Sequence, residues 1–443
     1  MKLNYKQTIL IGFAFFSISA FWQMYNNVIP LILTETFHMN ETLSGAIMAA
    51  DNILALFLLP MFGALSDRCT ARSGRRMPFI VWGTVAAVAL MMLLPILDNM
   101  YYVNHSMAIL VGFVAVLGLL LVAMGTYRSP AVALMPDCTP KPLRSKGNAI
   151  INLMGALGGI IYLLFTSVMY SGARTEGLEH ISYIPLFAFV GALMLISVTI
   201  VKFTVNERKL SGEVHRYELD HPDEVLAETD AEGKEILPKA VKRSLFFLLL
   251  SVALWYMGYN AVTTWFTAYA SKVWNMPLGT ASMCLTIAMA GAIVSYLPTG
   301  MLGSKFGRKK CILFGCFLLA GSFLAAWILT QMYDHFTPLL YIIFVTVGIA
   351  WAFICVHSLP MVVEMCSGSD TGKFTGYYYT FSMAAQSITP IISGFLMNKV
   401  SYSTLFPYSA LFVVGSIITM SLVRHGDIKI KAPKGLDAFD IDD

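Results

Sequence analysis

The stretch GALSDRCTARSGRRMPF, residues 63–79, lies between two segments made almost entirely of apolar side chains. Four arginines fall within nine positions of it: Arg68, Arg72, Arg75 and Arg76. A weaker copy, GMLGSKFGRKK, occupies residues 300–310, and its first glycine comes 237 positions after the first glycine of the earlier stretch. A basic loop that recurs between apolar segments predicts a membrane protein built from a repeat.

The composition agrees with this interpretation. Apolar residues make up 57% of the 443 positions and charged residues 13%, which is about half the charged share of a soluble domain. Apolar runs of about 20 residues are long enough to cross a bilayer as helices. The sequence therefore predicts an all-α polytopic membrane protein with the lipid bilayer as its surroundings. We expect twelve spans, at residues 9–35, 44–66, 79–97, 107–135, 147–170, 183–204, 244–271, 280–302, 311–331, 338–364, 374–398 and 403–423.

The basic residues are distributed unevenly between the two sides of these spans. All but four of the 30 Lys and Arg lie in, or at the edge of, the tails and alternate loops on one side. The exceptions are Arg128, Arg174, Lys272 and Lys399. The positive-inside rule makes the basic side cytoplasmic, so we expect both termini to be cytoplasmic in a multi-pass protein of the cell membrane. The same rule explains the basic loops without a nucleic-acid partner.

One long polar stretch, residues 205–243, divides the predicted spans into six and six. We therefore expect an N-terminal half at 1–205, a cytoplasmic linker at 206–242, a C-terminal half at 243–425 and a cytoplasmic tail at 426–443. Short motifs repeat between the halves at nearly one spacing. WQMYN at 22–26 is echoed by WYMGYN at 255–260, and an acid followed nine positions later by a lysine occurs at Asp137 and again at Glu364.

The basic loop resembles the signature of the major facilitator superfamily, G-x-x-x-D-R/K-x-x-x-x-R-R. The resemblance implies two six-helix halves that rock about a substrate near the bilayer midplane. It also implies that Arg75 and Arg76 hold the cytoplasmic ends of the two halves together, with the helix-ending acids as partners. The residues of this gating motif and its copy are Gly63, Asp67, Arg68, Arg75, Arg76, Asp137, Gly300, Arg308 and Glu364. The alternative is that the bases only enforce topology.

A longer string, GALSDRCTARSGRRMPFI, resembles the sucrose-carrier type of transporter, which is related to the glycoside–pentoside–hexuronide group of cation symporters. SPAVALMPDCTP and RSKGNAIINLMGALGGIIY, within residues 129–162, resemble the same type. The resemblance implies a cation-coupled symporter for a disaccharide or α-glucoside such as sucrose or maltose. The chain departs from it at three positions. Ala55 and Leu59 stand where sodium-coupled relatives carry acids, and Leu121 stands where sucrose carriers carry one.

A charged side chain inside a span is costly and is a functional hypothesis by default. Asp51 and Arg128 each lie about 10 Å inside a predicted span at 1.5 Å per residue. Asp51 is the one carboxylate predicted well inside a span, so we expect it to be the proton-coupling group, because burial disfavours its ionised form. The alternatives are that the two charges pair structurally, or that Arg128 reaches the inner surface.

Aromatic rings that stack on sugar faces, and amides that bond hydroxyls, cluster at mid-depth in corresponding spans of the two halves. Interhelical hydrogen bonding and interfacial anchoring are the alternative roles for such residues. The predicted substrate-binding residues are Trp22, Tyr25, Asn26, Asn27, Tyr127, Arg128, Asn152, Trp255, Tyr259, Asn260, Trp265 and Gln386.

Other classes of protein find less support in the sequence. Motifs of metalloproteases, serine hydrolases and phosphate-binding loops are missing, so we expect no enzyme, no metal and no cofactor, with a proton as the coupling ion. A monomer is expected. A sodium-coupled or uncoupled carrier of another small polar solute stays open, as does a sensor built on a transporter fold.

Overall fold

The computed structural model describes residues 4–140, 144–175, 177–220, 239–333, 335–363, 365 and 371–426. Helices account for the regular structure of these residues. In the first part of the chain they are α1 (Tyr5–Leu31), η1 (Ile32–Thr36), α2 (Glu41–Asp67), α3 (Met77–Asn104), α4 (Met107–Asp137), α5 (Arg144–Met169), α6 (Gly172–Thr175), α7 (Ile184–Thr204) and α8 (Glu207–Asp220). In the second part they are α10 (Lys239–Trp274), α11 (Leu278–Phe306), α12 (Arg308–Met332), α13 (Leu339–Val363), α14 (Thr371–Lys399), η4 (Tyr402–Thr404) and α15 (Leu405–Ser421).

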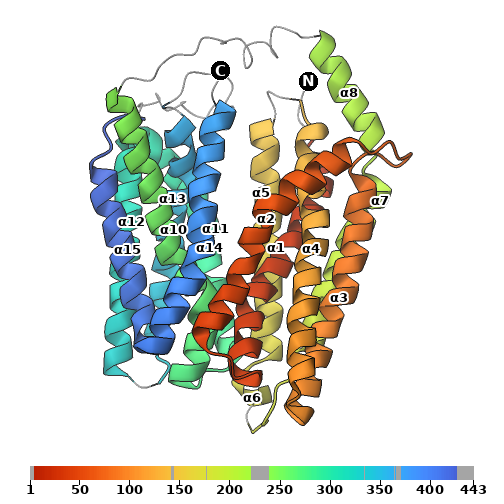
Figure 1. The fold of residues 1–443 in the computed structure, drawn as a ribbon. Coiled ribbons are helices and arrows are strands. Elements are labelled where there is room, and N and C mark those ends of the chain that lie inside the picture. Colours follow the sequence, from red (N-terminus) through yellow and green to blue (C-terminus); the bar gives the residue numbers. More distant parts are fainter. Residues whose placement is uncertain are drawn as a thin grey trace. The chain divides into compact units, whose positions relative to one another are not determined.

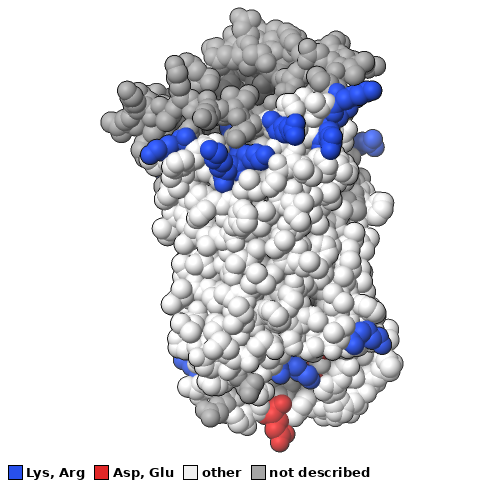
Figure 2. All heavy atoms as spheres, turned by 90° about the vertical axis from the view of Figure 1, so that its left-hand side faces the viewer, with Lys and Arg blue, Asp and Glu red and all other residues white. Residues whose placement is uncertain are grey.

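Within the described residues, eleven helices are long and apolar enough to cross a membrane. The long helix α14 is the twelfth element, at the position of the predicted span 374–398. Its polar residues include Gln386 and Tyr377. The all-α class and the twelve long helices confirm the predicted fold. On the face drawn in Figure 2, charged side chains lie toward the two ends and an uncharged band lies between them.

The described helices form two compact units. Unit 1 contains residues 1–228, 264–283 and 390–398, and unit 2 contains residues 229–263, 284–389 and 399–443. Three helices, α10, α11 and α14, therefore contribute residues to both units. The predicted boundaries of the two halves, which rest on the sequence repeat, stay a prediction.

Unit 1 is held together by close contact between helices, and α1 lies against α5 and α7 while α3 lies against α4 (Figure 1). Gly158 on α5 is so near α1 that an added Cβ would collide with the carbonyl group of Phe16. Small residues allow such backbone approach in membranes, where helix association depends on packing. The glycines near residue 158 are therefore packing positions.

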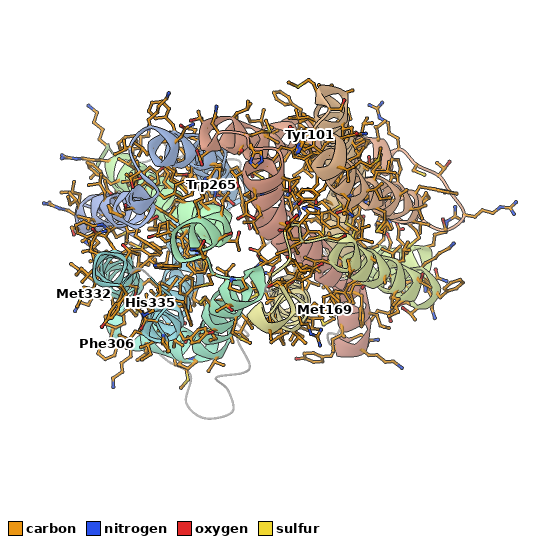
Figure 3. All side chains as sticks on the ribbon, turned by 90° about the horizontal axis from the view of Figure 1, so that it is seen from below. Tyr101, Met169, Trp265, Phe306, Met332 and His335 are labelled. Carbon is orange, nitrogen blue, oxygen red and sulfur yellow. The ribbon has the colours of Figure 1, made fainter. Side chains whose placement is uncertain are left out.

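Parts of α10 and α14 also belong to unit 1. The Thr267 hydroxyl donates a 2.8 Å hydrogen bond to the backbone oxygen of Asn27, and the backbone at Gly394 lies against that of Glu41. Trp265, fully buried and labelled in Figure 3, packs against Gly394. These contacts explain why residues 264–283 and 390–398 group with the first six long helices.

Unit 2 is likewise held together by close contact between helices. Helix α12 lies against α13 and α15, and Gly348 on α13 leaves room for the backbone of Ala288 on α11. Large apolar side chains such as Phe317 on α12 and Leu411 on α15 are exposed on the outside of the unit. A bilayer would cover these side chains.

Helix α3 is longer than the span predicted at 79–97. It runs to Asn104 and ends at His105, whose positive φ of 43° breaks the helix. The predicted span ends at residue 97, one residue before Asp98. No glycine or proline lies between Asp98 and His105, so the helix continues past Asp98. The Asp98 side chain is buried in the interior and is 0% exposed. Asp51 is therefore not the only carboxylate well inside a helix of unit 1.

Replacing Gly158 with Ala tests the close contact of α1 and α5. We expect the free energy of unfolding in detergent to fall by about 1–3 kcal/mol, the usual cost of overpacking a tight contact. The matched control is Gly118→Ala on α4, where an added Cβ meets nothing within 4 Å, and which should leave stability unchanged or slightly raised. Equal stability of the two variants would show that the α1–α5 contact is looser than described.

Candidate functional site

Three side chains from different helices meet in unit 1. Trp22 on α1, Asp51 on α2 and Arg128 on α4 line one small cavity. The Arg128 guanidinium carbon lies 5.4 Å from the centroid of the Trp22 ring, within the range of a cation–π contact. The rest of the cavity wall is apolar: Ala55, Leu58, Leu59, Leu121 and Gly125.

The Asp51 carboxylate has few polar neighbours in this cavity. It accepts a 2.9 Å hydrogen bond from the side-chain amide of Asn52, and it interacts electrostatically with Arg128. A carboxyl group with apolar walls and one basic neighbour can exist in either protonation state at modest cost. The arrangement can therefore bind and release a proton, and the partly exposed Trp22 can contact a bound molecule.

The other predicted residues of unit 1 are placed in different surroundings. Tyr25 is buried beside Trp22, with ring centroids 5.3 Å apart. Asn26 is partly exposed and Asn27 is buried. The Tyr127 hydroxyl donates a 2.8 Å hydrogen bond to the backbone oxygen of Ala14, so Tyr127 joins α4 to α1.

Asn152, the remaining predicted residue of unit 1, is exposed on α5. The structure thus brings together Trp22, Tyr25, Asp51 and Arg128 and places Tyr127 and Asn152 away from this cavity's lining.

Unit 2 contains an aromatic group on α10 and α13. The rings of Tyr259 and Trp351 stack face to face, with centroids 3.7 Å apart and planes 6° from parallel. Tyr256 meets the edge of Trp351 at 5.3 Å. All three side chains are partly exposed in unit 2. Stacked rings of this kind offer a flat apolar surface flanked by hydroxyl groups.

The predicted amides of unit 2 lie together. The Asn260 side chain donates a 3.4 Å hydrogen bond to the backbone oxygen of Gln386, and the Gln386 amide donates to the backbone oxygen of Ser382 at 3.2 Å. Trp255 is fully buried in unit 2, and Trp265 belongs to unit 1. Tyr259, Asn260 and Gln386 are therefore the partly exposed members of the predicted set in this unit.

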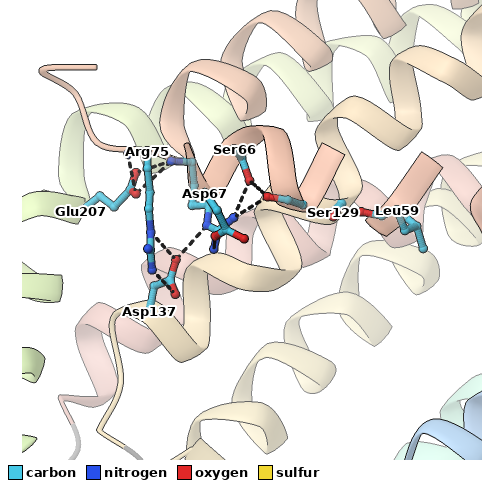
Figure 4. Close-up of polar contacts among 9 residues, drawn as sticks. Leu59, Ser66, Asp67, Arg75, Ser129, Asp137 and Glu207 are labelled. Carbon is cyan, nitrogen blue, oxygen red and sulfur yellow. Dashed lines mark hydrogen bonds and ion pairs between the residues drawn. The ribbon is translucent and has the colours of Figure 1, made fainter. Parts of the chain in front are cut away.

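The basic loop between α2 and α3 is fixed by a network of charges inside unit 1 (Figure 4). Arg75 forms a 2.7 Å ion pair with Asp137 at the end of α4, and Arg76 reaches the same carboxylate at 2.8 Å. Arg76 also binds Asp67 and Ser66. Burial lowers the pKa of Arg75, but its hydrogen bond and ion pair with Asp137 outweigh this and raise the pKa above its ordinary value.

A further carboxylate, Glu207 at the start of α8, holds the backbone of this loop. It accepts hydrogen bonds from the backbone N–H groups of Arg75 at 2.8 Å, Arg76 at 2.9 Å and Met77 at 3.0 Å. These donors stand at the beginning of α3, where a negative charge is favoured. Gly74 has a φ of +113°, and a Cβ there would collide with the Glu207 carboxylate.

The remaining residues of the gating motif are placed as follows. Gly63 packs near the hydroxyl of Ser129, with 3.2 Å between that oxygen and an added Cβ. Arg68 is exposed. In the second copy, Gly300 lies on α11 and Arg308 begins α12. Glu364 lies outside the described residues. The closure of two cytoplasmic halves by Arg75 and Arg76 stays a prediction, since their described partners all belong to unit 1.

Sequence reasoning did not single out Glu207, Tyr256, Trp351 or Asp98. Glu207 stands in the polar stretch assigned to the linker, 132 positions from Arg75, and only the fold brings the two together. Trp351 stands in an apolar run in which a tryptophan is typical of core or lipid contact. A signal was available for Tyr256, which is part of the repeated WYMGYN motif. Within the described part of the chain, no group of three or more His, Cys, Asp and Glu side chains could hold a metal ion.

Comparison with known proteins gives a match over most of the chain. The model of the Major Facilitator Superfamily matches residues 11–278 and 270–438. Sucrose transport protein SUC3 of Arabidopsis thaliana is 29% identical over 143 residues, covering 29% of this chain and 23% of that protein. Proton-associated sugar transporter A of Homo sapiens is 28% identical over 165 residues, covering 35% of this chain and 21% of that protein. The chain thus spans less than a quarter of the length of these two relatives in the matched segments.

Solved structures share the fold at low identity. A bacterial homologue of the iron transporter ferroportin, in an inward-facing state, superposes with a TM-score of 0.68 and 12% identity over 95% of this chain and 99% of that one. The nucleoside transporter NupG superposes with a TM-score of 0.65 and 14% identity over 95% of this chain and 100% of that one. At such identities the likeness establishes the architecture alone.

The role of Glu207 can be tested by replacement with Ala. Three backbone N–H groups at the start of α3 would lose their acceptor, and an unsatisfied buried polar group costs about 1–3 kcal/mol. We expect a lower free energy of unfolding and greater cleavage of the 68–76 loop by trypsin. The control is Glu213→Ala on the same helix, because its exposed carboxylate stands 3.9 Å from Lys209 and such pairs contribute little. Identical protease sensitivity in the two variants would contradict the assigned role.

Proposed function

Because the chain belongs to the Major Facilitator Superfamily, we propose that it is a secondary active transporter that moves a sugar together with a proton by alternating access. The observation that carries this proposal is the cavity of unit 1, where Asp51 stands opposite Arg128 and beside Trp22. The names of the two relatives, a sucrose transport protein and a proton-associated sugar transporter, favour a disaccharide or α-glucoside as substrate.

The choice of a proton over a sodium ion rests on the lining of this cavity. Sodium prefers several oxygen ligands, as hard cations do. The positions facing Asp51 are instead occupied by carbon side chains, Ala55 and Leu59 among them. A proton needs only the carboxylate itself. Arg128 then stabilises the ionised form of Asp51 when the proton leaves.

The proposed sugar ligands are the partly exposed aromatic and amide side chains of each unit. Tyr259 and Trp351 offer a stacked surface on unit 2, with Asn260 and Gln386 as nearby hydrogen-bonding groups. Trp22 offers a ring on unit 1. Sugars present apolar faces to rings and hydroxyl groups to amides, so this combination of residues fits a carbohydrate better than an organic ion.

The charge distribution supports the proposed orientation. The loop of Arg75 and Arg76 and the loop before α12 both belong to the basic side, which the positive-inside rule assigns to the cytoplasm. We therefore place both termini in the cytoplasm and the chain in the cell membrane as a monomer. In this orientation the network of Arg75, Arg76, Asp137 and Glu207 braces the cytoplasmic end of unit 1, and we assign the gating role of the basic loop to it.

Replacing Asp51 with Asn tests the coupling. Asn mimics the protonated carboxyl and cannot release a proton, so uphill accumulation of sucrose or maltose driven by a pH gradient should be lost while sugar exchange at equal concentrations continues. Both are measured with radiolabelled sugar in proteoliposomes, and Glu213→Gln, an exposed carboxylate on α8, is the control. Accumulation against a gradient by Asp51→Asn would rule out this residue as the coupling group. Accumulation that requires sodium in the unaltered protein would favour the sodium-coupled alternative.

Replacing Trp351 with Ala tests the aromatic surface of unit 2. We expect sugar binding to weaken about tenfold, since a lost stacking surface of about 1.4 kcal/mol corresponds to that factor. Binding is measured by isothermal titration calorimetry of the purified protein. Trp327→Ala is the matched control, because that ring is 38% exposed on α12 and is not itself a predicted sugar ligand. Equal affinities for the two variants would remove Tyr259 and Trp351 from the binding surface.

A further inference from the structure

Asp98 on α3 is a buried carboxylate that the proposed transport cycle does not use. Its side chain is 0% exposed, and neither carboxylate oxygen accepts a regular hydrogen bond from the residues that the structure describes. The Thr36 hydroxyl interacts with this carboxyl group from the neighbouring η1. Asp98 lies six residues before the end of α3, which is the outward end in the proposed orientation.

One histidine approaches this carboxylate. The Nε2 atom of His180, in the segment between α6 and α7, lies 3.7 Å from an Asp98 oxygen. The same nitrogen lies 2.8 Å from the side-chain oxygen of Asn99. The His180 ring stacks on Tyr102 with centroids 4.4 Å apart. The histidine is thus held beside Asp98 by a ring and an amide, with its Nε2 hydrogen donated to Asn99.

The charge of this pair can be worked out from its surroundings. Burial lowers the pKa of His180, so the imidazole is neutral at neutral pH and gives Asp98 no counter-charge. An ionised carboxylate buried without a partner is strongly unfavourable, and such groups take up a proton instead. The geometry alone therefore favours the neutral carboxyl form of Asp98.

The other titratable groups around Asp98 do not change this balance. On η1 the nearest acid in sequence is Glu35, which is hydrogen-bonded to Ser271. The segment before α7 carries Glu179, bonded to Tyr102 at 3.3 Å, and Tyr183, which interacts electrostatically with both Glu35 and Asp98. Helix α3 adds Tyr101, labelled in Figure 3, which meets the ring of His105. The facing part of α4 carries only uncharged side chains before Arg128. No basic residue among these replaces the missing counter-charge.

We propose that Asp98 is a second proton-binding site of this protein, separate from Asp51. The carboxyl group holds a proton at neutral pH and releases it at alkaline pH, beside the ring of His180, whose side chain is 17% exposed. A metal ion fits the site less well, because the described residues supply no cluster of three ligating side chains here.

A pocket in unit 1 is lined by Ile181, the residue that follows His180. It has a volume of about 430 Å³ and is lined by Glu35, Tyr183, Ser271 and Ile181 among others. Tyr183 lines this pocket and also interacts with Asp98. The hydrogen bond that Ser271 donates to Glu35 joins α10 to η1 at the pocket wall within unit 1. The site does not depend on Asp51 being the coupling group.

Infrared difference spectroscopy on the full-length protein tests this proposal. A protonated carboxyl group has a C=O band distinct from that of a carboxylate, and labelling with [¹³C]aspartate identifies it as aspartic acid. In the Asp51→Asn variant, which removes the other candidate, we expect a labelled carboxylic acid band at neutral pH that disappears at alkaline pH. The additional change Asp98→Asn should abolish this band. The additional change Glu35→Gln, a neighbouring acid, should leave it.

Each outcome decides the proposal. If the Asp51→Asn protein shows no labelled carboxylic acid band, Asp98 is not protonated and the proposal is wrong, whether or not Asp98→Asn folds. A band that survives Asp98→Asn belongs to another aspartate and overturns it equally. A band that appears in choline chloride but vanishes in sodium chloride would make Asp98 a sodium site. Loss of coupled transport in Asp51→Asn concerns the other site and leaves this result unaffected.

Discussion

Hydrocarbon offers no hydrogen bonds, so a polar side chain within a membrane span must find its partner inside the protein. Many hydroxyl groups of unit 1 obey this constraint by bonding to the preceding turn of their own helix, as Thr84 does. Others, such as those of Tyr127 and Thr267, bond to a neighbouring helix. The same constraint makes the exceptions informative. Asp51 in its apolar cavity and Asp98 beside His180 have few such partners among the described residues, and this separates them from the residues that join helices.

The fold could be predicted from the sequence because its determinants are local. Long apolar runs with polar loops between them give twelve helices whatever the details of packing, and the superfamily signature at 63–79 narrows the topology further. The end of α3 could not be predicted in the same way. The predicted span ends one residue before Asp98, but the helix continues to Asn104, because its termination depends on the backbone at His105.

The candidate site could be predicted from the sequence only where its residues belong to motifs. Asp67, Arg75, Arg76 and Asp137 stand in recognisable motifs, and the network forms among them. Glu207 and Trp351 belong to no such motif. Their place in the site depends on how helices distant in sequence pack together. Residues near a motif, such as Tyr127, were included because of their neighbours, and the direction of each side chain is set by helix rotation, which sequence spacing alone defines only roughly.

The contact between Gly74 and Glu207 has a consequence for the evolution of this loop. A side chain at position 74 and a carboxylate at position 207 exclude each other sterically, while the α3 backbone needs the acceptor that Glu207 provides. A substitution at either of these two positions is therefore unfavourable unless the other position changes as well. Among proteins descended from a common ancestor with this one, the glycine and the acid should be inherited together or lost together, although 133 positions separate them along the chain.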